Sequence, residues 1–530
     1  MISSAEALAA LRRYWGYDSF RPLQEKIVAS LLAGRDTCVV MPTGGGKSLC
    51  YQLPAALLPN QTVIVISPLI ALMQDQMAQL AQMGIPAGML NSSLPGDEQS
   101  RITRQAREGR YRLLYLSPER LAREDTVEWL KRVPISLFAI DEAHCISEWG
   151  HEFRPEYRQL SSLRNHFPDC PIAAFTASAT RQVRHDIMAQ LRLRNPDKYI
   201  ASFHRANLRY LVKQCDALTQ SELLVHAIGQ YPEGNIIVYA PTIQRVGATV
   251  ALLENHGIRA IGYHGQMDSA ARRQNQEVWM SDEVRVLVGT LAFGLGINKA
   301  AVRAVIHLSL PKSLEQYYQE AGRAGRDGQQ ADCILLWQKR DVGLLTYFID
   351  NIADNAEKQR AWQRYHDIRG YADSPTCRHR MICCHFGEIP KWKSCNACDL
   401  CGSAPEWLAG DAAAVKLQQA PIAAATSSNG TGRKSLRPVT PPNPEMDNEL
   451  REYLREWRRA VARKQGIAAF IVMHDSSLNE LCRLKPDTLA GVRLVPGFGE
   501  RKTELYGEQV LSALREFRNG ARAKIQNPVR

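Results

Sequence analysis

Apolar runs of strand length alternate with amphipathic helical stretches along most of the chain, and few folds accommodate such a pattern. The first series of runs lies at 37–41, 62–67, 112–116, 135–140 and 172–176. A second series lies at 235–239, 258–263, 285–289 and 304–308. Strands that alternate with helices form parallel sheets with helices on both faces. We therefore predict an α/β protein with two such domains in tandem.

The predicted domain boundaries follow from where this alternation stops. A helical segment with several cysteines comes next, and a stretch rich in Ala, Pro, Ser, Thr and Gly is then typical of a flexible linker. Helical periodicity returns through Leu450, Leu454, Trp457 and Val461, which predicts a small helical domain. The boundaries are 1–205 and 206–340 for the α/β domains, 341–402 for the cysteine segment, 403–445 for the linker and 446–522 for the helical domain.

The charge of the chain indicates a polyanionic partner. The 530 residues carry a formal net charge of +12 at pH 7, with a pI of about 9.1. No stretch approaches the roughly 20 apolar residues of a membrane span, and the first residues lack the layout of a secretory signal. We therefore expect no membrane partner and a cytoplasmic location, nucleoid-associated if the source is bacterial. The 13 cysteines are then not expected to form a disulfide framework.

A glycine-rich loop between a strand and a helix predicts a nucleotide site. Glycine N–H groups can surround phosphates, and a following lysine and hydroxyl can reach the β/γ-phosphates and Mg²⁺. The strict pattern of such loops is not met, because Met41 stands where its first glycine belongs. The predicted phosphate-binding residues are Thr43, Gly44, Gly45, Gly46, Lys47 and Ser48.

Two carboxylates and several planar side chains follow the apolar run at 135–140. Asp141 at a strand end can hold Mg²⁺, and Glu142 can orient water for attack on a phosphate. The loop after them offers planar groups on which nucleic-acid bases can stack, at roughly 1–3 kcal/mol per base. These groups are Trp149, Phe153, Arg154 and Tyr157. The alternative interpretation is a surface loop of packed aromatic residues.

A run of cysteines at C-x-x-C-x-x-C spacing predicts a metal site. Four thiolates suffice for a closed tetrahedral Zn²⁺ site of structural type. The proposed ligands are Cys377, Cys395, Cys398 and Cys401. Cys383 and Cys384 are competing upstream candidates, with packing on the helix as the preferred interpretation. An iron–sulfur cluster is the chemical alternative, because four cysteines can hold either centre.

Six motifs in chain order resemble those of superfamily 2 helicases, and specifically the RecQ family of DNA helicases. They are MPTGGGKS (41–48), SPLIALMQDQ (67–76), DEAHCISEWGHEFRPEY (141–157), FTASAT (175–180), VGTLAFGLGINK (288–299) and YYQEAGRAGRDG (317–328). The resemblance covers about residues 1–401. It implies two RecA-like domains with ATP in the cleft between them and ATP-driven movement 3′ to 5′ along single-stranded DNA, in recombination and repair.

The resemblance also assigns roles to single residues. Tyr17 and Arg21 would sandwich adenine, and Gln24 would hydrogen-bond its edge. Either Arg323 or Arg326 would be the arginine finger toward the γ-phosphate, and His144 would relay between the ATP and DNA sides. The implied DNA partners are single strands and forked or 3′-tailed duplexes, with a single-strand-binding protein as a candidate protein partner.

The C-terminal part, 446–522, resembles the HRDC domain of RecQ proteins. The winged-helix domain of that family is not recognisable in this sequence. Basic residues such as Arg458, Arg459 and Lys464 fit auxiliary DNA binding, although a solvated helix face is their commoner role. The winged helix that relatives place before HRDC has no counterpart in the low-complexity stretch 402–444. This departure leaves open the alternative of a DNA-binding and strand-annealing protein that unwinds weakly. An RNA helicase is a separate alternative, against which the aromatic-rich loop and the cysteine segment argue.

Overall fold

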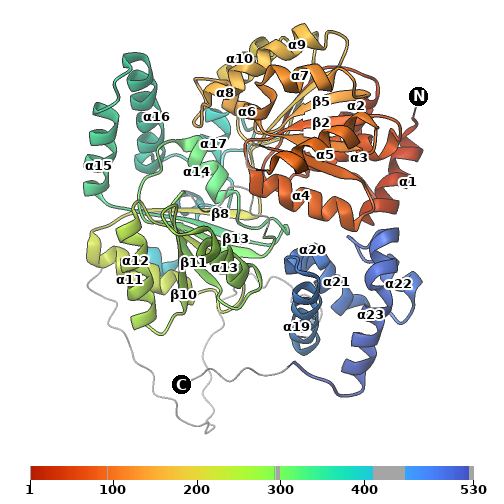
Figure 1. Ribbon diagram of the computed structural model, residues 1–530. Helices are drawn as coiled ribbons and strands as arrows, with labels where there is room; N and C mark the ends of the chain where they lie inside the picture. The colour runs from red at the N-terminus through yellow and green to blue at the C-terminus, as the bar shows by residue number, and fades with distance from the viewer. Residues whose placement is uncertain (1, 92–93, 292, 294–298, 410–447, 524–530) are drawn as a thin grey trace.

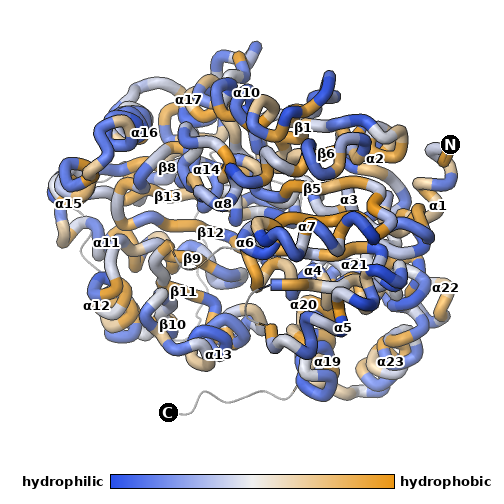
Figure 2. Tube along the Cα trace, turned by 45° about the horizontal axis from the view of Figure 1, so that its top comes forward, coloured by the Kyte–Doolittle hydropathy of each residue, from blue (hydrophilic) through white to orange (hydrophobic). Residues whose placement is uncertain are grey.

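The structure is a computed structural model that describes residues 2–91, 94–291, 293, 299–409 and 448–523. Two parallel sheets with helices on their faces form most of the molecule, and a C-terminal group of helices lies beside both (Figure 1). Apolar residues run along the strands of both sheets in Figure 2. None of the helices within the described ranges is long and apolar enough to cross a membrane.

The first sheet has strand order β3-β4-β2-β5-β6-β1-β7, with all neighbours parallel. Its five predicted runs are confirmed as strands. The two strands outside the prediction are the edge strands: β3 is only four residues long and contains Gly88, and β7 carries charged, half-exposed residues. The strands are β1 (Thr37–Val40), β2 (Thr62–Ile66), β3 (Ala87–Leu90), β4 (Leu113–Leu116), β5 (Ile135–Ile140), β6 (Ile172–Thr176) and β7 (Asp197–Ile200).

Alternate residues of these strands enter separate cores on the two faces of the sheet. Val39, Val63 and Val65 pack with one cluster, whereas Val40, Ile64 and Ile66 pack with the other. This burial on both faces explains why the strands are continuous apolar runs. The covering helices are α1 (Ser4–Trp15), α2 (Gln24–Leu32), α3 (Lys47–Leu57), α4 (Ile70–Gln82), α5 (Gly96–Arg107), α6 (Pro118–Leu121), α7 (Glu124–Leu130), α8 (Pro155–Arg158), α9 (Leu163–His166) and α10 (Arg181–Gln190), with short 3₁₀ turns at Ala143–Ile146 and Gln159–Ser162.

The second sheet has order β10-β11-β9-β12-β13-β8, also entirely parallel. Its four predicted runs are confirmed, and β8 and β13 complete the sheet at one side. The strands are β8 (Leu208–Gln214), β9 (Asn235–Tyr239), β10 (Ala260–Tyr263), β11 (Val286–Gly289), β12 (Val302–His307) and β13 (Ala331–Trp337). The helices are α11 (Ala217–Gly229), α12 (Ile243–Asn255), α13 (Ser269–Met280) and α14 (Leu314–Ala321).

The cysteine segment covers the outer edge of this second sheet, along β8. Its elements are α15 (Lys339–Asp350), α16 (Asn355–Asp373), α17 (Arg378–His385) and a 3₁₀ turn at Asp399–Cys401. Tyr210 of β8 forms a bridge with Cys398, and the Val212 amide donates to the Asp399 carboxylate at 3.2 Å. The segment also reaches the first domain, where Arg184 donates to the carbonyl of Phe386 at 3.0 Å.

The predicted linker at 403–445 mostly falls within 410–447, outside the described residues. Its first residues differ from the prediction, because α18 (Glu406–Ala409) lies against α11 and buries Leu408 in the core of the second domain.

The C-terminal helices have a core of their own, which includes Leu454, Leu478 and Val510. They are α19 (Asn448–Gln465), α20 (Ala469–Val472), α21 (Asp475–Leu484), α22 (Leu489–Arg493) and α23 (Glu500–Arg518). Figure 1 shows this group beside α4 of the first domain and α13 of the second.

Candidate active site

The predicted nucleotide site lies where the first sheet's loops meet the end of α14 from the second domain. A Cβ placed on Gly322, just after α14, would lie 2.7 Å from Oγ1 of Thr43. A Cβ on Gly44 would lie 3.3 Å from Cγ of Arg326. The phosphate loop of one domain and the arginine motif of the other are therefore in direct contact.

The loop between β1 and α3 has the shape that its glycines predict. Gly44 and Gly46 have φ angles of +80° and +83°, a left-handed conformation that favours glycine. Lys47 begins α3 and donates from Nζ to the carbonyl oxygen of Met41 at 3.1 Å. The Ser48 hydroxyl accepts from Nε2 of Gln76 at 3.2 Å. The loop thus presents a lysine, a hydroxyl and a helix N-terminus together, which suits a phosphate group.

The two carboxylates directly follow β5. Asp141 is 4% exposed, and its backbone N–H donates to the Ile66 carbonyl oxygen of β2 at 2.8 Å. Glu142 has a left-handed backbone with φ 46°, which turns the chain sharply at the strand end. Tyr157 is buried and its hydroxyl donates to the Asp141 carbonyl oxygen at 2.9 Å. The prediction that Tyr157 offers a stacking surface is therefore wrong: its ring belongs to the core behind the carboxylates.

Buried charge shifts the pKa values of this group. Burial and the neighbouring Glu142 raise the pKa of Asp141 to about 7, against the attraction of Lys47. Burial also acts to raise the pKa of Glu142, but the hydrogen bond and charge of His144 outweigh it and lower that pKa to about 2. Burial lowers the pKa of Lys47, opposed by both carboxylates. Asp141, which is buried, and Glu142, which is half-buried, offer adjacent carboxylate oxygens that a bound divalent cation would stabilise.

His144 connects the carboxylates to the neighbouring loops. Its Nδ1 lies 3.0 Å from Oγ1 of Thr176 at the end of β6 and 3.3 Å from the Glu142 carboxylate. Its ring stacks on that of His151, with centroids 4.6 Å apart. Sequence reasoning did not single out Thr176 or His151, although both lie within motifs that carried the resemblance.

A second contact joins the two domains near this histidine. Gln319 of α14 donates from Nε2 to Oγ of Ser178 at 2.8 Å. Ser178 follows β6 and lies within the FTASAT motif. The turn after β6 is thus held to His144 on one side and to the second domain on the other.

The predicted stacking residues differ in how much of their surface is free. Trp149 is 53% exposed, with the Arg360 guanidinium of α16 5.9 Å from its ring centroid. Phe153 is half-buried beneath Arg158, at 5.5 Å. Arg154 donates to the Glu152 carboxylate at 2.9 Å. Among these three, Trp149 offers the most open ring.

The residues expected to bind adenine lie beside the phosphate loop. Gln24 donates from Nε2 to the Gly46 carbonyl oxygen at 3.2 Å, and Arg21 donates to the Gly44 carbonyl oxygen. The backbone N–H of Arg21 donates to Oε1 of Gln24 at 2.8 Å. Tyr17 is half-buried next to Arg21, and burial raises its pKa. Gln24 and Arg21 therefore bind the backbone of the phosphate loop, and Tyr17 lies beside Arg21.

Arg323 and Arg326 have different surroundings. Arg326 lies against Gly44, and its charge helps to lower the pKa of Lys47. Arg323 donates a hydrogen bond to the hydroxyl of Tyr239 at the end of β9, where burial raises the pKa of Tyr239 to about 12 and the charges of both Arg323 and Arg326 oppose that rise. Arg326 is thus the arginine that faces the phosphate loop.

The four predicted metal ligands come together. The sulfur atoms of Cys377, Cys395, Cys398 and Cys401 all lie within 4.8 Å of one another. Cys383 is buried in the hydrophobic core and Cys384 is exposed, and neither belongs to this group. Four converging sulfurs match the donor set and closed geometry of a structural zinc site.

Comparison with family profiles finds four matches in chain order. They are the DEAD/DEAH box helicase family at residues 21–186, the helicase conserved C-terminal domain at 219–328, RecQ zinc-binding at 339–402 and the HRDC domain at 447–514. Each match falls on a unit of the fold described above.

Curated relatives agree with these profiles. The chain is 41% identical to the ATP-dependent DNA helicase RecQ of Haemophilus influenzae, over 77% of this chain and 65% of that protein. It is 38% identical to the protein of the same name from Bacillus subtilis, over 76% of this chain and 67% of that protein. The chain spans less than two thirds of the length of the first of these relatives.

Solved structures share the fold at low identity. The DEAD-box helicase Mss116 bound to ssRNA and UDP-BeF has a TM-score of 0.53 at 15% identity, covering 68% of this chain and 80% of that one. The Mycobacterium smegmatis helicase Lhr bound to ssDNA and AMP-PNP has a TM-score of 0.51 at 19% identity, covering 64% and 48%. These neighbours confirm the prediction of two tandem RecA-like domains. Together with the four family profiles and the relatives, they show that the chain belongs to the RecQ family of DNA helicases.

Proposed function

We propose that this chain is an ATP-dependent DNA helicase that moves 3′ to 5′ along single-stranded DNA, acting in recombination and repair. The observation that carries the proposal is the contact of Arg326 with the phosphate loop across the domain boundary. A nucleotide in that loop would touch both domains, so its hydrolysis would change how they fit together. Alternation between two such states is the basis of a motor.

The residues of the site divide the hydrolysis step among them. Lys47 would leave the Met41 carbonyl and bind the β- and γ-phosphates. Ser48 and Asp141 would hold a magnesium ion, which when bound neutralises phosphate charge. Glu142, whose low pKa keeps it ionised, would orient the attacking water.

Arg326 would be the arginine finger. A guanidinium at the γ-phosphate stabilises charge that develops in the transition state. The position of Arg326 against Gly44, with its charge felt at Lys47, supports this choice. Arg323 would hold the end of β9 through Tyr239.

Coupling to DNA would pass through His144. Its contacts reach Glu142 on the ATP side and His151 in the aromatic loop. A base that stacks on Trp149 would order this loop and thereby the orientation of Glu142. The RNA helicase and strand-annealing alternatives are separated from this proposal by the experiments below.

The first test is unwinding polarity. We expect unwinding of a 3′-tailed duplex, but not of a 5′-tailed one, in the presence of ATP and Mg²⁺. Lys47→Ala should lower the ATPase rate by at least about 100-fold, because a charge aimed at the transferred phosphate is lost. Unchanged DNA processing by Lys47→Ala would favour the annealing alternative, and stimulation of the ATPase by RNA as strong as by DNA would favour the RNA alternative.

The second test separates the two arginines. Arg326→Ala should lower kcat by about 10³-fold or more, with ATP affinity close to that of the unchanged protein, because a finger acts mainly in the transition state. Arg323→Ala is the matched control, and its kcat should fall by a smaller factor. Single-turnover hydrolysis and fluorescent-nucleotide binding measure the two quantities. A larger loss in Arg323→Ala would reverse the assignment.

The third test addresses the aromatic loop. Trp149→Ala should raise the DNA concentration that gives half-maximal ATPase stimulation by roughly 5- to 150-fold, the equivalent of one lost stacking contact. The rate without DNA should not change. Tyr347→Ala removes another exposed aromatic ring, on α15, and serves as the control. If DNA stimulates the ATPase of both variants and of the unchanged protein equally, the role of the loop is structural.

The fourth test concerns the four cysteines. Elemental analysis of the purified protein should find about one zinc ion per chain and no iron. Cys395→Ser should lose the zinc and unfold the segment around it, since binding of a structural metal is itself folding free energy. Cys384→Ser, outside the cluster, should keep the metal. Iron together with acid-labile sulfide would instead indicate an iron–sulfur cluster.

A further inference from the structure

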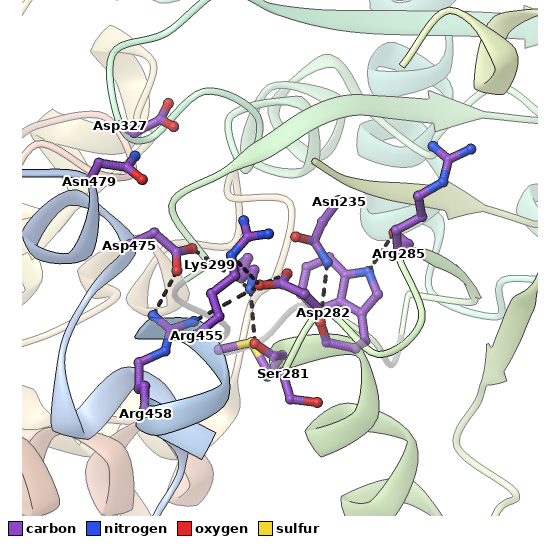
Figure 3. A network of polar contacts seen from close by, with 12 residues as sticks. Asn235, Ser281, Asp282, Arg285, Lys299, Asp327, Arg455, Arg458, Asp475 and Asn479 are labelled. Carbon is purple, nitrogen blue, oxygen red and sulfur yellow. Dashed lines mark hydrogen bonds and ion pairs between the residues drawn. The ribbon is translucent and has the colours of Figure 1, made fainter. Parts of the chain in front are cut away.

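The arginines of α19 face an acidic turn of the second RecA-like domain. This turn joins α13 to β11 and contains Asp282, which has a left-handed φ of 65°. Arg459 donates from Nε to the Ser281 carbonyl oxygen at 2.7 Å, and Arg455 lies 3.8 Å from the Asp282 carboxylate. Arg463 pairs with Glu283 at 3.4 Å. Arg459 thus contacts the helicase core instead of solvent, and Arg458 lies 3.9 Å from the Asp282 carboxylate (Figure 3). Lys464 is exposed, as expected of a solvated helix face.

The centre of this contact is a buried network of charges. Lys299 is 3% exposed, and its Nζ lies 2.7 Å from one oxygen of Asp282 and 3.7 Å from Asp475 of α21. Arg458 is 1% exposed and pairs with Asp475 at 2.7 Å. Three cations, Lys299, Arg455 and Arg458, therefore meet two carboxylates from both sides of the interface. Arg455 has a further partner in Glu452 of its own helix. Loss of one partner would leave a buried charge uncompensated, which is strongly unfavourable.

The same helical domain also contacts the first RecA-like domain. A Cβ on Gly499 would lie 2.4 Å from the Tyr14 carbonyl oxygen, and one on Gly16 would lie 2.8 Å from the carbonyl carbon of Phe498. The two backbones therefore touch at the end of α1. The Tyr506 hydroxyl donates to Oε1 of Gln82 at 2.6 Å, and α20 lies against α4.

Both contacts lie next to motifs of the proposed ATPase. Gly16 directly precedes Tyr17, in the segment expected to bind adenine, and Lys299 ends the motif 288–299. A body attached to both domains resists any change in their relative position. The side toward the second domain includes ion pairs and a hydrogen bond to one carbonyl oxygen, whereas the side toward the first includes close backbone contact.

We propose that the HRDC domain is an internal brace between the two RecA-like domains, and that its α19 face is released from the 281–283 turn when the relative position of these domains changes during the ATP cycle. While docked, the brace slows ATP turnover in the absence of DNA. The inference rests on the proposed ATPase function. It predicts that weakening the contact from either side accelerates basal hydrolysis.

The test uses one variant on each side of the contact in the full-length chain. Asp282→Asn removes the central charge and keeps a residue type that tolerates the left-handed turn. The double variant Arg455→Gln with Arg459→Ala acts from α19. Lys464→Ala, an exposed position on the same helix, is the control. Amide hydrogen exchange of residues 280–284 reports docking, and exchange of 506–514 reports the integrity of the HRDC fold.

Both test variants should show faster exchange at 280–284 with 506–514 still protected. Their DNA-free ATPase should rise by about 5-fold or more, the lower end of typical coupling between sites. Faster exchange without a higher ATPase rate would contradict the proposal that the docked HRDC domain slows ATP turnover. A higher ATPase rate in Asp282→Asn but not in the α19 variant would also contradict the proposed inhibition, because the change would then come from the lost partner of Lys299 and not from undocking. Unchanged exchange in both variants would exclude docking at this turn. An unchanged protein that hydrolyses no ATP with DNA present would refute the proposed function instead, and the exchange measurement would still report docking.

Discussion

The gathering of charged groups from two domains at one loop is the feature on which the rest of this structure depends. Asp141 and Glu142 end a buried strand, Lys47 interacts with both, and Arg326 reaches the same loop from the other domain. A triphosphate with its metal ion would meet groups of both domains at once, so nucleotide binding and domain arrangement would depend on each other.

Connections between the domains lie on several sides of this site. Gln319 binds the turn after β6, the cysteine segment binds both domains through Arg184 and Asp399, and the HRDC domain touches both from a further side. Movement at the nucleotide is therefore opposed by contacts of different strength. Exposed ion pairs such as Arg463 with Glu283 can be exchanged for water at low cost. Packed backbone and the buried pairs of Lys299 and Arg458 cannot.

The sequence allowed the fold and the positions of the phosphate loop, the carboxylates and the four cysteines to be predicted, because each depends on local pattern. Parallel strands buried on both faces are continuous apolar runs, and Cys395 to Cys401 lie within one short turn. The role of Tyr157 could not be predicted, since an aromatic residue in a loop does not show whether its ring faces solvent or core. Arg459 binds Ser281, 178 residues away in the chain, and Arg458 pairs with Asp475 of another helix, and helical periodicity can reveal neither partner.

The position of β8 gives the cysteine segment a second consequence. A strand at the edge of a sheet carries unpaired N–H and C=O groups that can recruit a strand from another molecule. Here Cys398 and Asp399 occupy part of that edge, and the order of their turn would depend on the zinc ion that we propose the four cysteines bind. Zinc supply during synthesis would therefore decide whether newly made chains remain monodisperse or self-associate through β8, before any question of catalysis arises.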